Sequence, residues 1–135
     1  MRDPTPETRF YKTQDPSFMR VTEERFRELV QRAIDSLPPE FRSKLDNVEV
    51  IVEQEPTKEQ QGAFRGMLLG LYHGVPQPKR STFMAFIPPD VVFLFQKNIQ
   101  RICRTEEELE REVRATLQHE IGHHFGMTEE DLRDI

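Results

Sequence analysis

The chain has 135 residues and a net charge of −5, with 24 Asp and Glu against 19 Lys and Arg, and 36% of its residues are hydrophobic. This length predicts one domain with one modest core, and the acidic balance argues against a general nucleic-acid-binding protein. The single cysteine, Cys103, excludes an intrachain disulfide framework and is expected as a small buried side chain. The longest purely apolar run, Val91–Phe95, is too short to span a membrane. Because the first ten residues also lack the apolar stretch of a secretory signal, we expect a cytoplasmic protein.

Residues 1–20 are rich in Pro, Thr and charged side chains, which predicts a flexible tail ahead of a domain over residues 21–135. Thr22 is expected to cap the first helix, and Pro38-Pro39 to end it. A short second helix is expected around Glu40–Leu45. Apolar residues recur at helical spacing within the first helix: Phe26, Leu29, Val30, Ala33, Ile34 and Leu37.

The middle of the chain predicts a small sheet. Asn47–Glu53 alternates between apolar and acidic residues, which is typical of a half-buried strand. Val91–Phe95 is apolar on both faces and is expected to be the most buried strand. The remaining expectations are a long loop over Gln54–Gly66, strands at Met67–Tyr72 and Ser81–Ile87, a turn at His73–Pro76 and one or two helical turns at Asn98–Cys103.

The longest predicted helix begins at Thr105, which forms a capping box with Glu108. Its core-facing stripe consists of Leu109, Val113, Leu117 and Ile121, with His124 expected on the same side. Gly126 is expected to stop the helix in the left-handed conformation, and Thr128 to cap a last short helix.

Near the end of this helix the sequence reads His119-Glu120-Ile121-Gly122-His123. Residues four apart lie on one face of a helix, so His119 and His123 can bind a single cation. Glu120 projects to one side, where it can reach a water molecule bound to that cation. Two exposed histidines beside a surface Glu would explain the bare motif, but its place in a capped, amphipathic helix before Gly126 favours the metal site.

A catalytic zinc needs a third protein ligand and an open position. Only 12 residues follow His123, which leaves too little chain for a ligand from a distant helix. The spacing His-x-x-Gly-x-x-ligand, which some zinc peptidases use, leads from His123 through Gly126 to Glu129. Glu130 and Asp131 remain alternatives, and all three acids would also suit a helix N-terminus without any metal.

The chemistry that follows is hydrolysis, in which zinc lowers the pKa of a bound water and Glu120 takes its proton and returns it to the leaving amine. Tyr72 is a candidate donor to the oxyanion, although a core aromatic explains it equally well. His124 is expected to pack or to support a ligand rather than to bind metal itself. His73 is expected to face solvent in a turn.

The helix motif HEIGHHFGM, together with LPPEF, NVEVIVE, LLGLYHGVP and PPDVVFLFQ, resembles the small bacterial zincin-like metallopeptidases, also called minimal zincins, from about residue 22 to the end. The resemblance implies an α+β fold in which a small mixed or antiparallel sheet packs against an N-terminal helix and an active-site helix. It also implies one Zn²⁺ held by His119, His123 and Glu129, with Glu120 catalytic.

We therefore expect a zinc-dependent peptidase that acts as a monomer on peptides or unfolded proteins, with no nucleic-acid or membrane partner. The substrate would pair with an exposed sheet edge at Met67–Tyr72 or Ser81–Ile87. The alternative is a zinc-stabilised, non-catalytic module that binds proteins or peptides.

Overall fold

The structure is a computed structural model and describes residues 20–74 and 90–126. The strand predicted at Ser81–Ile87, the helix expected after Thr128 and residues 1–19 of the predicted tail lie outside this part of the chain. In chain order, the described elements are α2 (Glu23–Asp35), α3 (Pro39–Lys44), β1 (Val48–Glu53), α4 (Lys58–Gln61), β2 (Gly70–His73), β3 (Asp90–Phe95), α6 (Gln96–Gln100) and α7 (Glu106–His124).

The sheet is mixed, with strand order β1-β3-β2. β1 runs parallel to β3 and β2 runs antiparallel to it, so that Val50 and Tyr72 flank Val92 from either side. β3 is therefore the central strand, and its Val92 and Leu94 are fully buried, as the apolar run predicted. The expected α+β fold with a small mixed sheet is confirmed.

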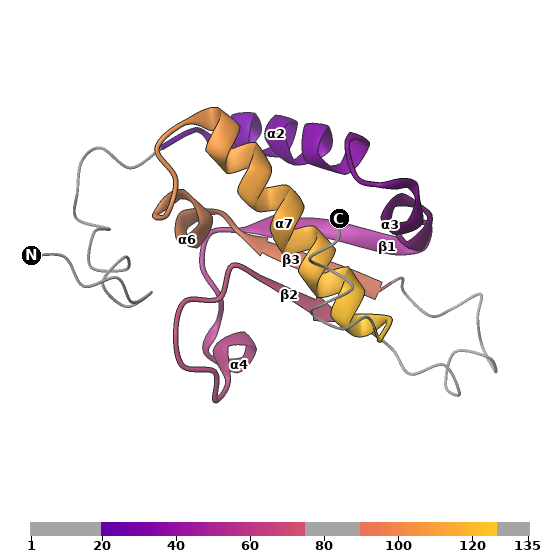
Figure 1. The fold of residues 1–135 in the computed structure, drawn as a ribbon. Coiled ribbons are helices and arrows are strands. Elements are labelled where there is room, and N and C mark those ends of the chain that lie inside the picture. The colour runs from indigo at the N-terminus through magenta and orange to yellow at the C-terminus, as the bar shows by residue number, and fades with distance from the viewer. Residues whose placement is uncertain (1–19, 75–89, 127–135) are drawn as a thin grey trace, which may run out of the picture.

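Helices α2 and α7 pack against each other and lie on the same side of the sheet, where α7 runs obliquely past β3 and β2 (Figure 1). Both begin at the predicted caps, because the Thr22 hydroxyl accepts from Arg25 N and the Thr105 hydroxyl accepts from Glu108 N. The predicted capping box at Thr105 is only half formed, since the Glu108 carboxylate accepts from Arg104 N. The predicted stripe of α7 is fully buried: Leu109, Val113, Leu117 and Ile121. No helix in the described ranges is long and apolar enough to cross a membrane.

His124 does not continue this buried stripe, contrary to the sequence prediction. Its side chain is 37% exposed, and its ring lies against Tyr72 of β2. The other stripe residues are four apart, whereas His124 follows Ile121 by three, which rotates it by about 60° away from Ile121 around the helix. The last turn of α7 therefore directs this ring toward β2 rather than into the core.

The connection between β1 and β2 also differs from the prediction. Residues expected to be loop contain α4, which Thr57 and Gln60 begin with a reciprocal capping box. β2 begins at Gly70 rather than Met67, and His73 is its exposed last residue rather than part of a turn. The short α4 lacks an apolar periodicity, so only its caps could have indicated it.

Helix α6 follows β3 directly and carries three buried polar residues, Gln96, Asn98 and Gln100. The Gln100 Oε1 accepts from Val21 N at 3.0 Å, and Gln96 Nε2 donates to Val21 O at 3.1 Å. Asn98 Nδ2 donates to Leu68 O at 2.7 Å. These bonds attach Val21, just before α2, and Leu68, just before β2, to the helix that follows the central strand. Cys103, just beyond α6, is buried as expected.

Candidate metal centre

The two histidines of the predicted metal pair lie together near the C-terminal end of α7. Both side chains are exposed, their ring centres are 6.1 Å apart, and their planes are inclined by 32°. Since a zinc–imidazole bond is about 2.1 Å long, one ion can lie within reach of both rings. The helix therefore brings His119 and His123 together as the sequence predicted.

The main chain of α7 orients His119. Its Nδ1 lies 3.0 Å from the carbonyl oxygen of Ala115, one turn earlier. A carbonyl only accepts hydrogen bonds, so this contact places the proton on Nδ1 and leaves the Nε2 lone pair for a cation. Metal-binding histidines are commonly oriented in this way, and the donor set thus fits a zinc ion.

Glu120 projects from α7 toward β2 rather than toward open solvent. Its Oε1 accepts a hydrogen bond of 3.1 Å from the main-chain N–H of Tyr72. Burial raises the pKa of the Glu120 carboxyl above its ordinary value, while the Tyr72 N–H and then His123 and His119 act in the opposite direction. A raised pKa suits a carboxylate that must accept a proton and release it again.

β2 can approach α7 closely because Gly70 has no side chain. A Cβ at this position would lie 2.6 Å from Thr116 Cγ2 and 3.0 Å from the carbonyl oxygen of Phe93. It would also lie 3.6 Å from Cγ of Glu120. The glycine therefore sets the distance between the edge strand and the helix that carries the candidate site.

A polar and aromatic cluster lies at the far end of β2. The Tyr72 hydroxyl donates to Asp90 Oδ2 at 2.6 Å, and the Tyr72 ring stacks on His124 with centres 3.8 Å apart. His124 Nε2 lies 3.8 Å from the same carboxylate oxygen. The sequence allowed two roles for Tyr72, a donor to the oxyanion or a core aromatic. In this structure its hydroxyl is hydrogen-bonded to Asp90.

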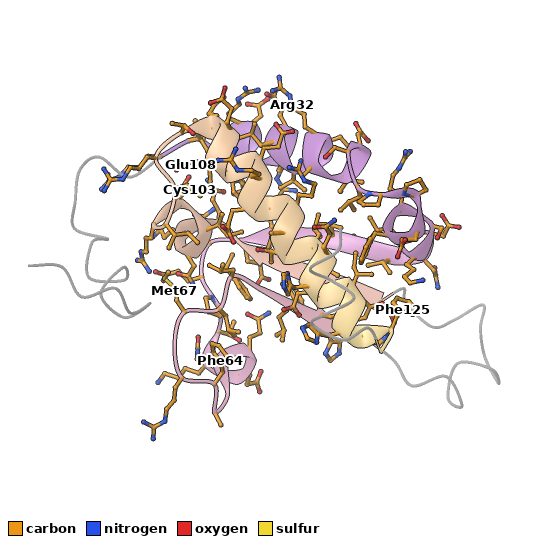
Figure 2. All side chains as sticks on the ribbon, viewed as in Figure 1. Arg32, Phe64, Met67, Cys103, Glu108 and Phe125 are labelled. Carbon is orange, nitrogen blue, oxygen red and sulfur yellow. The ribbon has the colours of Figure 1, made fainter. Side chains whose placement is uncertain are left out.

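An open groove of about 290 Å³ adjoins His119 and Glu120. Its lining is mostly apolar, and Figure 2 places Phe64 and Met67 on the segment between α4 and β2 that forms one wall. Phe64 is 54% exposed, which is unusual for so large an apolar residue. The groove is lined by Phe64, Met67, Leu68, Leu69 and Gly70 on one side and by Glu112, Ala115, Thr116, His119 and Glu120 on the other.

The predicted third ligand lies beyond the described residues. Within residues 20–74 and 90–126, no group of three or more His, Cys, Asp or Glu is arranged to hold a metal ion. The backbone does follow the predicted course up to Gly126, whose φ of 81° is the left-handed conformation expected of a helix stop. Glu129, Glu130 and Asp131 follow this turn and remain the predicted candidates.

Sequence reasoning missed Asp90 and Gly70 as parts of the site. Asp90 follows two prolines, which indicate only a turn, yet it is 5% exposed at the start of the central strand. An acid directly preceding a buried apolar strand was the available signal, since a buried carboxylate requires a hydrogen-bonding partner. Nothing local marks Gly70, because its role depends on a helix that lies 46 residues further along the chain at Thr116.

Comparison with known proteins agrees with this geometry. Residues 45–135, which include β1, β2, β3 and the whole of α7, match the zincin-like metallopeptidase family. The chain therefore belongs to that family. A search of curated proteins found no match.

A solved structure is similar over most of the chain. It is described as a conserved hypothetical protein from Thermo thermophilus, is 27% identical in sequence, and superimposes with a TM-score of 0.51. The similarity covers 77% of this chain and 94% of that one. The description of this neighbour names no activity, so the likeness bears on the fold.

Proposed function

We propose that the chain is a zinc-dependent peptidase in which His119, His123 and Glu129 hold the ion and Glu120 is the general base. The observation that carries the proposal is the placement of Glu120. Its carboxylate lies beside two histidines that one ion can reach, and it is held against the edge of a sheet. Membership in the zincin-like metallopeptidase family supports the same reaction class.

Zinc, when bound, would polarise the scissile carbonyl and lower the pKa of the attacking water. Glu120 would take the proton of that water on Oε2, since Oε1 accepts from Tyr72 N, and would deliver it to the leaving amine. The His119 Nδ1–H bond to Ala115 O would keep the imidazole in the tautomer that leaves Nε2 available.

The groove beside the histidines supports a peptide as the substrate. β2 is at the edge of the sheet that the described residues form, so an extended peptide can add to it by main-chain pairing. The groove adjoins Met67–Gly70, at the N-terminal end of β2. A peptide paired antiparallel to β2 would therefore place there the side chain that follows the scissile bond, and the apolar lining favours an apolar residue at that position.

The test compares the zinc-loaded protein with Glu120→Gln on a library of unstructured peptides, with zinc content measured for both. We expect the wild type to cleave preferentially before apolar residues, and the variant to keep its zinc while losing at least about a hundredfold in rate. His119→Ala is the matched control for the metal and should lose zinc.

Cleavage by Glu120→Gln at the wild-type rate would refute the role of Glu120, and full zinc content in His119→Ala would refute the metal pair. A fully zinc-loaded wild type that binds library peptides without cleaving any would identify the chain as a zinc-stabilised binding module instead.

A further inference from the structure

Glu120 has a flexible side chain that is half-buried between α7 and β2, and a general base must be held within a few tenths of an ångström of its productive position. Its own helix does not supply that restraint. A hydrogen bond to its carboxylate comes instead from β2, through the Tyr72 N–H at 3.1 Å. The position of Glu120 thus depends on the position of an edge strand.

β2 is four residues long and pairs with only one neighbour among the described strands, β3. Short edge strands are held weakly by their main-chain ladder alone. Additional contacts from the Tyr72 side chain would fix this strand, because the same residue supplies the N–H that binds Glu120. The ring and hydroxyl of Tyr72 therefore matter for the base, although neither touches it.

Asp90 provides the anchor for that side chain. Its carboxylate is 6% exposed, and it accepts from the Tyr72 hydroxyl at 2.6 Å. A hydrogen bond to a buried carboxylate is stronger and better directed than one between neutral groups. Asp90 belongs to the central strand, whose Val92 and Leu94 are fully buried.

His124 closes the arrangement from the helix side. Its ring stacks on Tyr72 at 3.8 Å, and a Cβ on Gly74 would lie 2.9 Å from His124 Cε1. Tyr72 is thus held between the last turn of α7 and the first residue of β3, while its main chain reaches back to Glu120 on α7.

We propose that Tyr72 is a positioning residue for Glu120 and that the buried carboxylate of Asp90 anchors it. This inference rests on the proposed peptidase function for its catalytic consequence. Its structural part, the coupling between the Tyr72 hydroxyl and the Tyr72 N–H bond to Glu120, stands independently.

The first experiment measures hydrogen exchange of the residue-72 amide, which needs no turnover. Tyr72→Phe removes the hydroxyl and keeps the ring, and we expect its residue-72 amide to exchange about tenfold faster than in the wild type. Glu120→Ala should have a similar effect, and the double variant should exchange no faster than either single variant, because all remove the same restraint. Asp90→Asn keeps an acceptor but loses the charge, so its rate should lie between those of the wild type and Tyr72→Phe, whereas Asp90→Ala should resemble Tyr72→Phe.

A control separates positioning from loss of stability. Phe41→Leu alters a fully buried residue on α3, away from β2, and should accelerate exchange across β3 and β2 to a similar degree. An unchanged residue-72 amide in Tyr72→Phe, or additive effects in the double variant, would overturn the proposal.

The second experiment concerns catalysis. In Tyr72→Phe with full zinc content, we expect kcat to fall about tenfold with KM unchanged, and in Asp90→Asn we expect a smaller fall in kcat, because a neutral acceptor remains. An unchanged kcat in Tyr72→Phe would refute the catalytic role of the anchor. A wild type without activity would refute the peptidase proposal and leave the exchange result to decide on the coupling.

Discussion

Thr105 caps the start of α7 and Thr116 lies within it, and only the Thr105 hydroxyl has a hydrogen-bond partner among the described residues. The Thr105 hydroxyl accepts from Glu108 N at 3.1 Å and caps α7. The Thr116 Oγ1 is buried and has no hydrogen-bond partner among the described residues. A buried hydroxyl without a partner loses its hydration and gains nothing in return.

We therefore predict that Thr116→Val stabilises the protein by about 1 kcal/mol, because it replaces an unpaired hydroxyl with a methyl group of similar size. Chemical denaturation of the zinc-free protein would measure the change. The methyl group Cγ2 that packs against Gly70 can be kept, so the contact between α7 and β2 need not change.

The matched control is Thr105→Val, which makes the same chemical change at the cap and should destabilise by about 1 kcal/mol. If Thr116→Val also lowered the free energy of unfolding, the Thr116 hydroxyl would have a hydrogen-bond partner in solution.

Residues of the site differ in how far the sequence could predict them. His119, Glu120 and His123 lie within five consecutive residues of one helix, so the helical period alone fixes their relative directions. The contact from Tyr72 N to Glu120 joins residues 48 apart, and the Tyr72–Asp90 bond joins residues 18 apart. Such contacts depend on strand register and on where α7 crosses the sheet, which no local pattern determines.

At the scale of the elements, the contact between β2 and α7 decides the geometry of the site. It depends on Gly70, because the strand passes the helix with no room for a side chain at this position. Tyr72, two residues on, points to the same face and reaches His124. A displacement of β2 would therefore move the Tyr72 N–H away from Glu120.

We predict that Gly70→Ala destabilises the protein by about 1–3 kcal/mol, since its Cβ would overlap Thr116 Cγ2 and press on the Phe93 carbonyl. Thermal or chemical unfolding would measure the loss. Adding Thr116→Ala removes the closer of these atoms and should recover part of the stability, but not all, because the backbone oxygen remains.

A Gly70→Ala variant as stable as the wild type would mean that β2 can shift without cost. In that case the distance between β2 and α7 would not be set by this residue.

The elements themselves were predictable where one signal dominated. α7 has a cap, a four-residue apolar repeat and a glycine stop, and each was found where expected. The start of β2 was predicted at Met67 instead of Gly70, because Met67–Leu69 are as apolar as the residues of a buried strand. The Leu68 carbonyl oxygen instead accepts a hydrogen bond from the Asn98 side chain, a long-range bond that the sequence does not reveal.

At the scale of the whole molecule, the candidate metal site lies outside the described core. α2, α3, β1, β3 and α7 all contribute to one cluster of buried side chains, while His119 and His123 are exposed at the end of α7. The arrangement contrasts with small zinc-dependent domains, in which the metal replaces a core.

We therefore predict that chelation of zinc leaves the fold intact. The zinc-free protein should keep its helical circular dichroism and a cooperative unfolding transition, with a lower Tm than the zinc-loaded form. Ligand binding to the folded state alone stabilises it by about 2.7 kcal/mol at a free concentration 100 times Kd.

A non-cooperative transition after chelation would contradict this prediction. Identical Tm values with and without saturating zinc would argue that the folded protein does not bind the ion.

The bond between the Tyr72 N–H and Glu120 also has a consequence for association between chains. Leu69 O accepts from Phe95 N, so by the alternation of an antiparallel pair the polar main-chain groups of Tyr72 face away from β3. An outward N–H on an edge strand is a point where a second copy of the chain could add a strand and begin to aggregate. Glu120 already occupies that donor, so a chain that adds to this edge, whether a substrate peptide or a second copy, would pair with the remaining outward main-chain groups of β2, such as those of Gly70.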